Sequence, residues 1–322
     1  MKKILALCLS VLTIASLMFA VGCSDKKENG ASTLKFGSGV YVSTPATTDA
    51  TADKEGTGKV DVTVAAVTVD ADGKIIACAL DTASNTVKFT KDGKAVANSE
   101  FKTKYESGKD YNMVAYGGAK KEWYEQADAF EALVAGKTLT EVKALVAAEN
   151  KGNDEVVNAG CTIMIHEFVG AIEKAYNAAK ASDVTAKDTL KVTAATEQTC
   201  TDATADKDGS NKVAVYVFAA ALNADKKVVA AQSDCVEVAF TFTTKAVVSK
   251  KEAGTNYGMV AFGNAKKEWF EQAAAFDAAC VGKTGAEIAG LVAADGKGVA
   301  DLQSAGCTVY VTGFVKAAEK IK

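Results

Sequence analysis

Two short stretches of this 322-residue chain carry groups that could do chemistry, and both read A-G-C-T. The matched residues are Gly160, Cys161 and Thr162 in the first stretch and Gly306, Cys307 and Thr308 in the second. The thiols suggest redox chemistry, although neither has the C-x-x-C partner that such sites usually carry. The hydroxyls could be modified, or each could cap a helix, because threonine is a good N-cap residue.

Each A-G-C-T stretch belongs to a longer internal repeat. Residues 111–136 and 257–282 are identical at 17 of 26 aligned positions, and TDATADKEG (48–56) aligns with TDATADKDG (201–209). The alignment offset is 153 upstream and 146 downstream, so the first copy has seven extra residues, which we place around 91–99. We therefore expect two homologous domains, 34–180 and 190–322, joined by a linker at 181–189.

The first 22 residues have the features of an export signal. Two lysines precede an apolar run, and the segment ends in Ala20-Val21-Gly22-Cys23, which resembles the lipobox of bacterial lipoproteins. This predicts a lipid on Cys23, a flexible tether at 23–33 and a protein anchored in the cytoplasmic membrane, facing outside. The alternative is a cleaved signal or a single membrane anchor, although 17 apolar residues are marginal for a span.

Composition argues against several functions. All 37 basic residues are lysine, so no guanidinium group can bind phosphates or base edges in a bidentate manner, and nucleic-acid binding is not expected. Without the two signal lysines the net charge is 35 − 40 = −5, which offers no general basic surface. The single histidine, His166, aligns with Thr312 of the second copy, so a function present in both copies cannot depend on histidine. We expect His166 at the surface or at a helix start.

Eight cysteines in an exported protein would suggest disulfide bonds, but their positions argue against a shared framework. Only Cys161 and Cys307 correspond between the copies. Most of the other thiols are expected to be small buried apolar groups. A bridge between Cys200 and Cys235, private to the second copy, remains open.

Each copy has a strand half followed by a helical half. Alternating apolar residues predict antiparallel strands, with an apparent shift of phase at Ala65-Ala66. The expected strand segments are 60–66, 75–80 and 87–90 in the first copy and 213–217 and 236–242 in the second, with turns at Asp72-Gly73 and Asp225-Lys226. The fold class is therefore α+β, with a twisted antiparallel sheet packed against two or three helices in each copy.

The helical half begins near Ala119 and contains two capping boxes, Thr138 with Glu141 and Thr284 with Glu287. A further helix follows each A-G-C-T stretch, at 167–180 and 313–320. Because each copy contains a complete set of elements, we expect each to fold alone.

The chain resembles the FMN-binding domain family. The resemblance rests on Gly37-Ser38-Gly39-Val40-Tyr41, the valine strand, the D-G-K-I hairpin at 72–75, and a small-residue turn ending in Thr before an F-x-x-A-x-x-K-A helix. The family includes subunits of sodium-pumping oxidoreductases and the extracellular electron-transfer flavolipoproteins of Gram-positive bacteria. The resemblance implies that a flavin transferase joins the phosphate of FMN to a threonine in the motif D-x-x-S/T-G-A-S/T.

Mapped onto this chain, the acceptor threonines are Thr162 and Thr308, and the motif glycines are Gly160 and Gly306. The chain departs from the motif at three positions in each copy. Cys161 and Cys307 replace Ala, Ala159 and Ala305 replace Ser/Thr, and Val156 and Leu302 replace Asp.

The chemistry of such a site fits these residues. A phosphoester needs an exposed hydroxyl on a tight turn, and a helix N-terminus can bind the phosphate. The aromatic residues shared by both copies could contact the flavin ring or could belong to the core, and they are Tyr111, Tyr257, Trp123 and Trp269. The sequence thus predicts a surface lipoprotein with up to two covalent FMN groups that relays electrons between a membrane donor and an extracellular acceptor. No general acid or base is duplicated at the motif itself, which indicates a carrier rather than a turnover enzyme. The alternative is a repeat-built surface protein that binds ligands or adheres without a cofactor.

Overall fold

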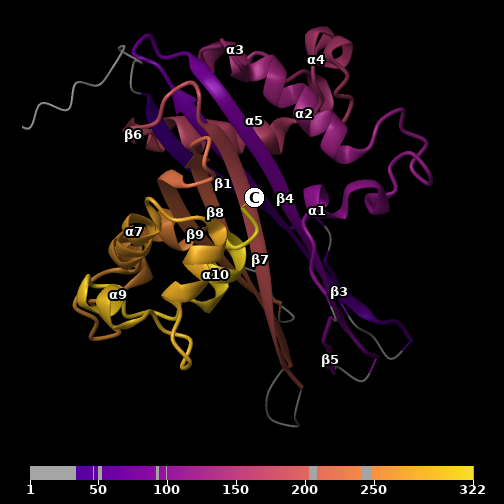
Figure 1. Ribbon diagram of the computed structural model, residues 1–322. Helices are drawn as coiled ribbons and strands as arrows, with labels where there is room; N and C mark the ends of the chain where they lie inside the picture. Colours follow the sequence, from indigo (N-terminus) through magenta and orange to yellow (C-terminus); the bar gives the residue numbers. More distant parts are fainter. Residues whose placement is uncertain are drawn as a thin grey trace, which may run out of the picture. The chain divides into compact units, whose positions relative to one another are not determined.

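The computed structural model describes residues 34–321, except residues 46, 50–52, 92–93, 99, 203–208 and 241–247. The signal segment and Cys23 therefore lie outside the described residues. The fold class is α+β, as expected, with two antiparallel sheets (Figure 1). Among the described residues, no helix is both long and apolar enough to cross a membrane.

The first sheet has the strand order β5-β4-β3-β1-β6, and β2 pairs with β3. Its strands are β1 (Lys35–Ser43), β2 (Thr47–Thr48), β3 (Gly56–Val69), β4 (Ile75–Phe89), β5 (Ala95–Val96) and β6 (Lys180–Ala181). The second sheet has the order β7-β8-β9, with β7 (Thr189–Thr201), β8 (Ser210–Leu222) and β9 (Val228–Phe240). The predicted turn at Gly73 is confirmed, and its φ of 79° requires the freedom of glycine.

Two of the strand predictions were wrong in detail. The segments at 75–80 and 87–90 are parts of the single strand β4, whose middle is polar but buried. There the hydroxyls of Thr82 and Thr63 lie 2.9 Å apart and form a hydrogen bond, so these buried polar side chains have a partner. The phase shift at Ala65-Ala66 is also absent, because both faces of β3 are covered and residues on either face can be apolar.

Helices cover the outer face of each sheet. In the first copy they are α1 (Lys104–Ser107), α2 (Trp123–Val134), α3 (Leu139–Lys143), α4 (Asp154–Ala159) and α5 (His166–Ala178). In the second copy they are α6 (Lys250–Ala253), α7 (Trp269–Cys280), α8 (Gly285–Ile288), α9 (Ala300–Ser304) and α10 (Thr312–Ala318). Short 3₁₀ turns lie at Gly108–Tyr111, Ala148–Asn150, Gly254–Tyr257 and Ala289–Leu291. Both predicted capping boxes are present.

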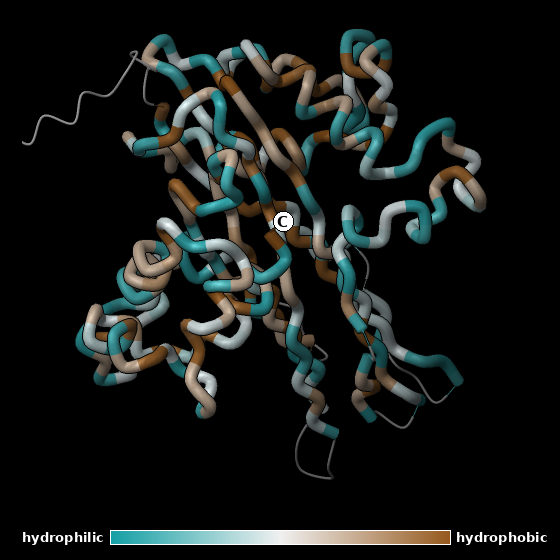
Figure 2. Tube along the Cα trace, in the orientation of Figure 1, coloured by the Kyte–Doolittle hydropathy of each residue, from teal (hydrophilic) through white to brown (hydrophobic). Residues whose placement is uncertain are grey.

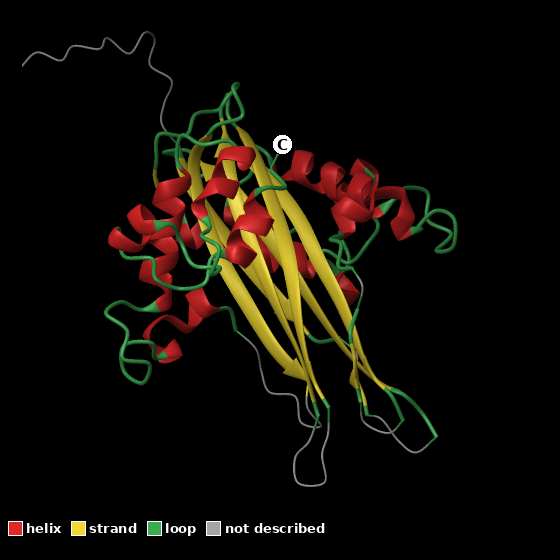
Figure 3. Cartoon of the chain, turned by 60° about the horizontal axis from the view of Figure 1, so that its bottom comes forward, coloured by secondary structure: helices red, strands yellow, loops and turns green. Residues whose placement is uncertain are grey.

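The two sheets pack face to face, so the layers run helix, sheet, sheet, helix (Figure 3). Valines of β3, such as Val62 and Val64, share one buried cluster with Val215 and Val236 of the second sheet. Apolar residues follow the central strands, and many loops are polar (Figure 2). Residues 32–322 form one compact unit. The expectation that each copy folds alone did not anticipate this shared core, and it remains to be tested.

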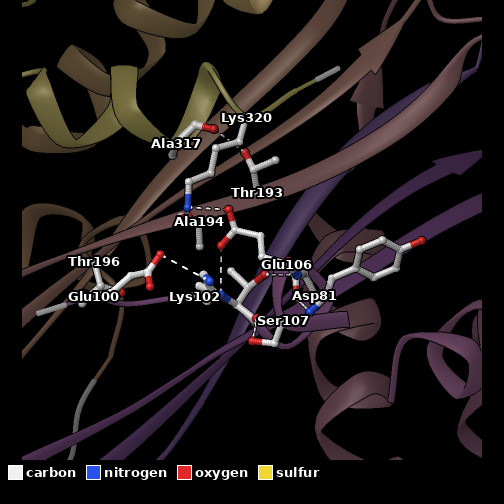
Figure 4. A network of polar contacts seen from close by, with 12 residues as sticks. Asp81, Glu100, Lys102, Glu106, Ser107, Thr193, Ala194, Thr196, Ala317 and Lys320 are labelled. Carbon is white, nitrogen blue, oxygen red and sulfur yellow. Dashed lines mark hydrogen bonds and ion pairs between the residues drawn. The ribbon is translucent and has the colours of Figure 1, made fainter. Parts of the chain in front are cut away.

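Reciprocal contacts relate the two copies by an approximate twofold axis. Glu106 of α1 pairs with Lys320 near the chain end at 2.7 Å (Figure 4), and Glu252 of α6 pairs with Lys174 of α5 at 2.5 Å. Each member of the second pair stands 146 residues from its counterpart in the first. The copies therefore meet through the same surface of each, as the subunits of a symmetric dimer do.

The extra residues of the first copy break this symmetry. They include β5, which lies within the segment placed at 91–99. The amide of Asn98 donates to Gln198 Oε1 at 2.7 Å, and Gln198 Nε2 donates to the carbonyl of Val96 at 3.0 Å. The insertion thus ties the tip of the first sheet to the second copy.

Candidate functional site

Each A-G-C-T stretch is a turn, as predicted, and it follows a short helix that was not predicted. Gly160 ends α4 with φ 101°, and Gly306 follows α9 with φ 105°, so both need the left-handed conformation that glycine adopts readily. A side chain at either position would also collide with an ammonium group, because Lys121 Nζ lies against Gly160 and Lys267 Nζ against Gly306. The left-handed φ therefore favours glycine at this turn, whereas the flexible lysine side chain could move aside to admit a Cβ.

The threonine that follows is exposed in both copies, and a buried glutamine orients it. Gln126 Oε1 accepts the backbone N–H of Thr162 at 2.8 Å and its hydroxyl at 3.0 Å. In the second copy, Gln272 Oε1 accepts the same two groups of Thr308, both at 2.9 Å. The helix-cap alternative was wrong, because α5 begins at His166 and α10 at Thr312, four residues later in each case.

Sequence reasoning missed these glutamines and lysines, although the signal was present. Both belong to the repeated segment K-K-E-W-x-E-Q, which is unchanged between the copies apart from one aromatic position. The glutamine amide also donates to the carbonyl of the second lysine, at 3.0 Å in each copy. A single clamp therefore connects the start of α2 or α7 to the threonine turn.

The cysteines of the turn do not face a ligand. Cys161 and Cys307 are fully buried in the cores beneath the helices, and burial raises the pKa of each thiol to about 11. A reactive thiol needs an accessible thiolate, so this burial argues against the redox alternative, and the predicted part of both cysteines in a cofactor site stays a prediction. Cys200 and Cys235 are free, so the structure also lacks the bridge left open between them.

The missing motif aspartate has a structural cause. Val156 and Leu302 stand at its position, and both are buried in the core. The nearby Glu155 points elsewhere and pairs with Lys137 at 2.7 Å. The turn therefore lacks the carboxylate that the resemblance would place there.

Of the predicted aromatic residues, the tryptophans belong to the core. Trp123 is 3 % exposed and Trp269 4 %, which supports the core alternative for both. Tyr111 and Tyr257 are partly exposed. Each tyrosine and the neighbouring tryptophan share a lysine, because Lys104 Nζ lies 5.6 Å from the Tyr111 ring and 5.7 Å from the Trp123 ring. Within the described part of the chain, no contact links these rings to the threonines.

The most exposed aromatic side chains are Tyr116, at 87 %, and Phe262, at 89 %. They occupy equivalent positions in two loops, 112–121 and 258–267, which we call the aromatic loops. Each loop ends at the lysine that lies against the motif glycine. Neither Tyr116 nor Phe262 was among the predicted site residues.

Two cavities lie where the copies meet. One, of about 230 Å³, contains Glu131 beside Leu190 and Lys191, and the other, of about 710 Å³, contains the equivalent Asp277 beside Lys180. Burial raises the pKa of Glu131 to about 8 and also raises that of Asp277. Both carboxylates accept a backbone N–H of the adjoining strand, from Leu80 at 2.6 Å and from Ser233 at 3.1 Å, which gives them a structural role.

Comparisons with protein-family models, with curated proteins and with solved structures each found no match. Function must therefore be argued from the geometry of the chain itself.

Proposed function

We propose that this protein is a lipid-anchored surface carrier with one FMN esterified to Thr162 and one to Thr308, passing electrons from a membrane donor to an extracellular acceptor. One observation carries the proposal. Both copies present an exposed threonine hydroxyl, oriented by a buried glutamine, on a glycine turn that also holds a lysine ammonium.

The residues present fit the phosphate end of FMN. Glycine leaves the backbone open to close approach, and Lys121 or Lys267 supplies a positive charge next to the position of the phosphodiester. The ring end has fewer candidates, because the tryptophans are buried and only Tyr111 and Tyr257 of the predicted set are accessible. FMN, when bound, supplies reversible electron uptake.

The chain's own residues hold the hydroxyl but do not activate it. Gln126 and Gln272 are amides, so neither can take the proton that threonine loses when the ester forms. That proton must go to a base of the flavin transferase, which is the expected partner. A carrier role asks for no general base at the threonine turn, so this division of labour fits a carrier.

A second candidate function is a surface protein that binds ligands or adheres without a cofactor. The aromatic loops favour it, because large exposed rings at matched positions are typical of interaction sites. The two functions are compatible, since the loops and the threonine hydroxyls are different groups.

The test is co-expression with a flavin transferase from the same host. The intact mass should rise by two FMN groups, and the colour should persist after denaturation. Thr162→Ala should lose one FMN and Thr308→Ala the other, while Thr138→Ala, a helix-cap variant in the same copy, should lose neither. A wild type with unmodified mass would contradict the carrier proposal, and colour lost on denaturation would contradict covalent attachment.

A further inference from the structure

The two aromatic loops keep one backbone shape although their sequences differ. Asn112 and Gly258 both have left-handed φ angles, 61° and 75°. Gly118 and Asn264 match in the same way, at 66° and 53°. Glycine and asparagine tolerate this conformation best, so the exchanges preserve the loop.

A buried glutamate fixes each loop from beneath. Glu122, 7 % exposed, accepts the backbone N–H of Met113 at 2.9 Å and of Val114 at 3.3 Å. Glu268 does the same for Met259 at 3.0 Å and Val260 at 3.3 Å. Hydrogen bonds to a charged acceptor are stronger than neutral ones, so the loops are held in place before any partner arrives. A preorganised loop loses less conformational entropy on binding.

The fixed loops present apolar groups to solvent. Tyr116 and Phe262 stand at their tips, and Val114 and Val260 beside them are 45 % and 46 % exposed. Tyr116 and Phe262 both have an aromatic ring, but only the tyrosine has a hydroxyl. The property that the two copies share is therefore an apolar aromatic surface. Large rings of this kind, when they enter a pocket, often dominate binding energy.

Lysines flank the rings on the same loops. Lys120 and Lys266 are exposed and make no ion pair within the described ranges. The one glutamate at the base of each loop is buried and occupied by backbone N–H groups. Each loop therefore combines an apolar tip with positive charge, although the mature chain as a whole is negative. Acidic partners would be attracted here and repelled by much of the remaining surface.

The positions of the two loops favour separate protein partners over a membrane surface. The loops lead into α2, which packs on the first sheet, and α7, which packs on the second (both labelled in Figure 1), so they adjoin opposite outer faces of the paired sheets. A flat lipid surface cannot contact both loops at once, whereas two separate molecules can.

We propose that each aromatic loop docks an acidic protein segment whose apolar side chains pack against Tyr116 or Phe262 and whose carboxylates pair with Lys120 or Lys266, so that one chain binds two such segments. The proposal does not depend on FMN, because neither the rings nor the lysines at positions 120 and 266 belong to the threonine turn.

The test uses residues 24–322, the mature chain without the cysteine predicted to carry lipid, prepared without a flavin transferase. A phage-displayed library of random peptides is selected on it, and the enriched peptides are synthesised and titrated by calorimetry. Acidic peptides with apolar residues should be enriched and should bind two per chain. Tyr116→Ser and Phe262→Ser should each remove one site, and the double variant should bind at least tenfold more weakly. Combined charge reversal, Lys120→Glu with Lys266→Glu, should also weaken binding.

Tyr310→Ser is the matched control, because Tyr310 is 66 % exposed but lies outside both loops, and it should bind like the wild type. Circular dichroism establishes that each variant is folded. Equal peptide binding by the wild type and the double variant would overturn the proposal, as would a selection that enriches nothing. Loop-dependent binding to phosphatidylglycerol vesicles would assign the loops to a membrane surface instead. Loop-dependent dimerisation in sedimentation would assign them to a second copy of this chain.

Discussion

The helical halves of the two copies are nearly the same, whereas the strand tips are not. Around the threonine turn, every hydrogen bond of the glutamine clamp recurs within 0.1 Å between the copies. At the strand tips, among the residues that the structure describes, β5 and its contacts to Gln198 are found in the first copy alone. The helical halves of both copies have the same surroundings, since each is exposed to solvent. The strand tips of the two copies contact different segments of the chain. The surfaces that stayed alike are therefore the candidates for a duplicated function, and those that diverged serve the junction.

The largest expected effect comes from separating the copies. The clusters between the sheets draw residues from both, and the ring of Phe240 lies against Gly58 of the other copy. Fragments 33–180 and 188–322 would each expose one wall of this core, so neither should unfold cooperatively, whereas the whole chain should unfold in one transition. Calorimetry of the three proteins checks this. Two cooperative fragments would show that the helical cores suffice for folding.

The next effect is a dependence of stability on pH. Burial raises the pKa of Asp81 and of Asp234 to about 6, and that of Glu131 to about 8. All three values exceed those of the unfolded chain, so the folded state binds more protons, and stability is lost as pH rises through about 4–8. The free energy of unfolding should be about 2–5 kcal/mol larger at pH 5 than at pH 8.

Urea titrations at the two pH values measure this difference. Asp81→Asn and Asp234→Asn should each remove part of it, and by similar amounts, because both aspartates accept equivalent backbone N–H groups. Higher stability at pH 8 than at pH 5 would refute the assignment.

A smaller effect is expected at the glutamine clamp. Gln126→Ala and Gln272→Ala each remove a buried side chain together with its three hydrogen bonds, and each should cost about 1–3 kcal/mol of unfolding free energy. The two costs should agree within about 0.5 kcal/mol, because the clamps are alike, and urea titration at one pH compares them. Thr162→Ala, which removes only an exposed hydroxyl, serves as the mild control. A large difference between the glutamine variants would show that the clamps are not equivalent.

Much of the fold could be predicted from local signals. The capping boxes at Thr138 and Thr284 and the hairpin at Gly73 depend on neighbouring residues, so the sequence shows them directly. The pairing of the two sheets could not be predicted, because a valine such as Val62 looks the same whether it faces a helix or another sheet. The polar middle of β4 misled for a related reason, since its partner Thr63 lies on another strand.

The candidate site divides in the same way. The glycine and threonine of each turn were identified from the repeat and from the resemblance. The burial of Cys161 and Trp123 could not be read from the repeat, because identity between the copies does not separate a core residue from a surface one. Gln126 was missed because its role depends on a contact 36 residues away in the chain. The roles of these residues became visible only from their burial and from contacts between residues that are distant in the sequence.

The smallest expected effect tests whether the aromatic loops are equivalent in shape. Replacing Asn112 with Gly and Gly118 with Asn gives the first loop the left-handed residues of the second. Because both residue types accept positive φ, stability should change by no more than about 0.5 kcal/mol. Gly118→Val at the same site places a β-branched side chain at φ 66° and should cost at least about 1 kcal/mol. Urea titration compares the two variants, and the peptides selected on the wild type should still bind two per exchanged chain. The contrary outcome is an exchanged loop that keeps its stability but no longer binds a peptide. Binding would then depend on the particular residues at positions 112 and 118 rather than on the left-handed backbone that both loops share. The two loops would then be separate surfaces with separate requirements.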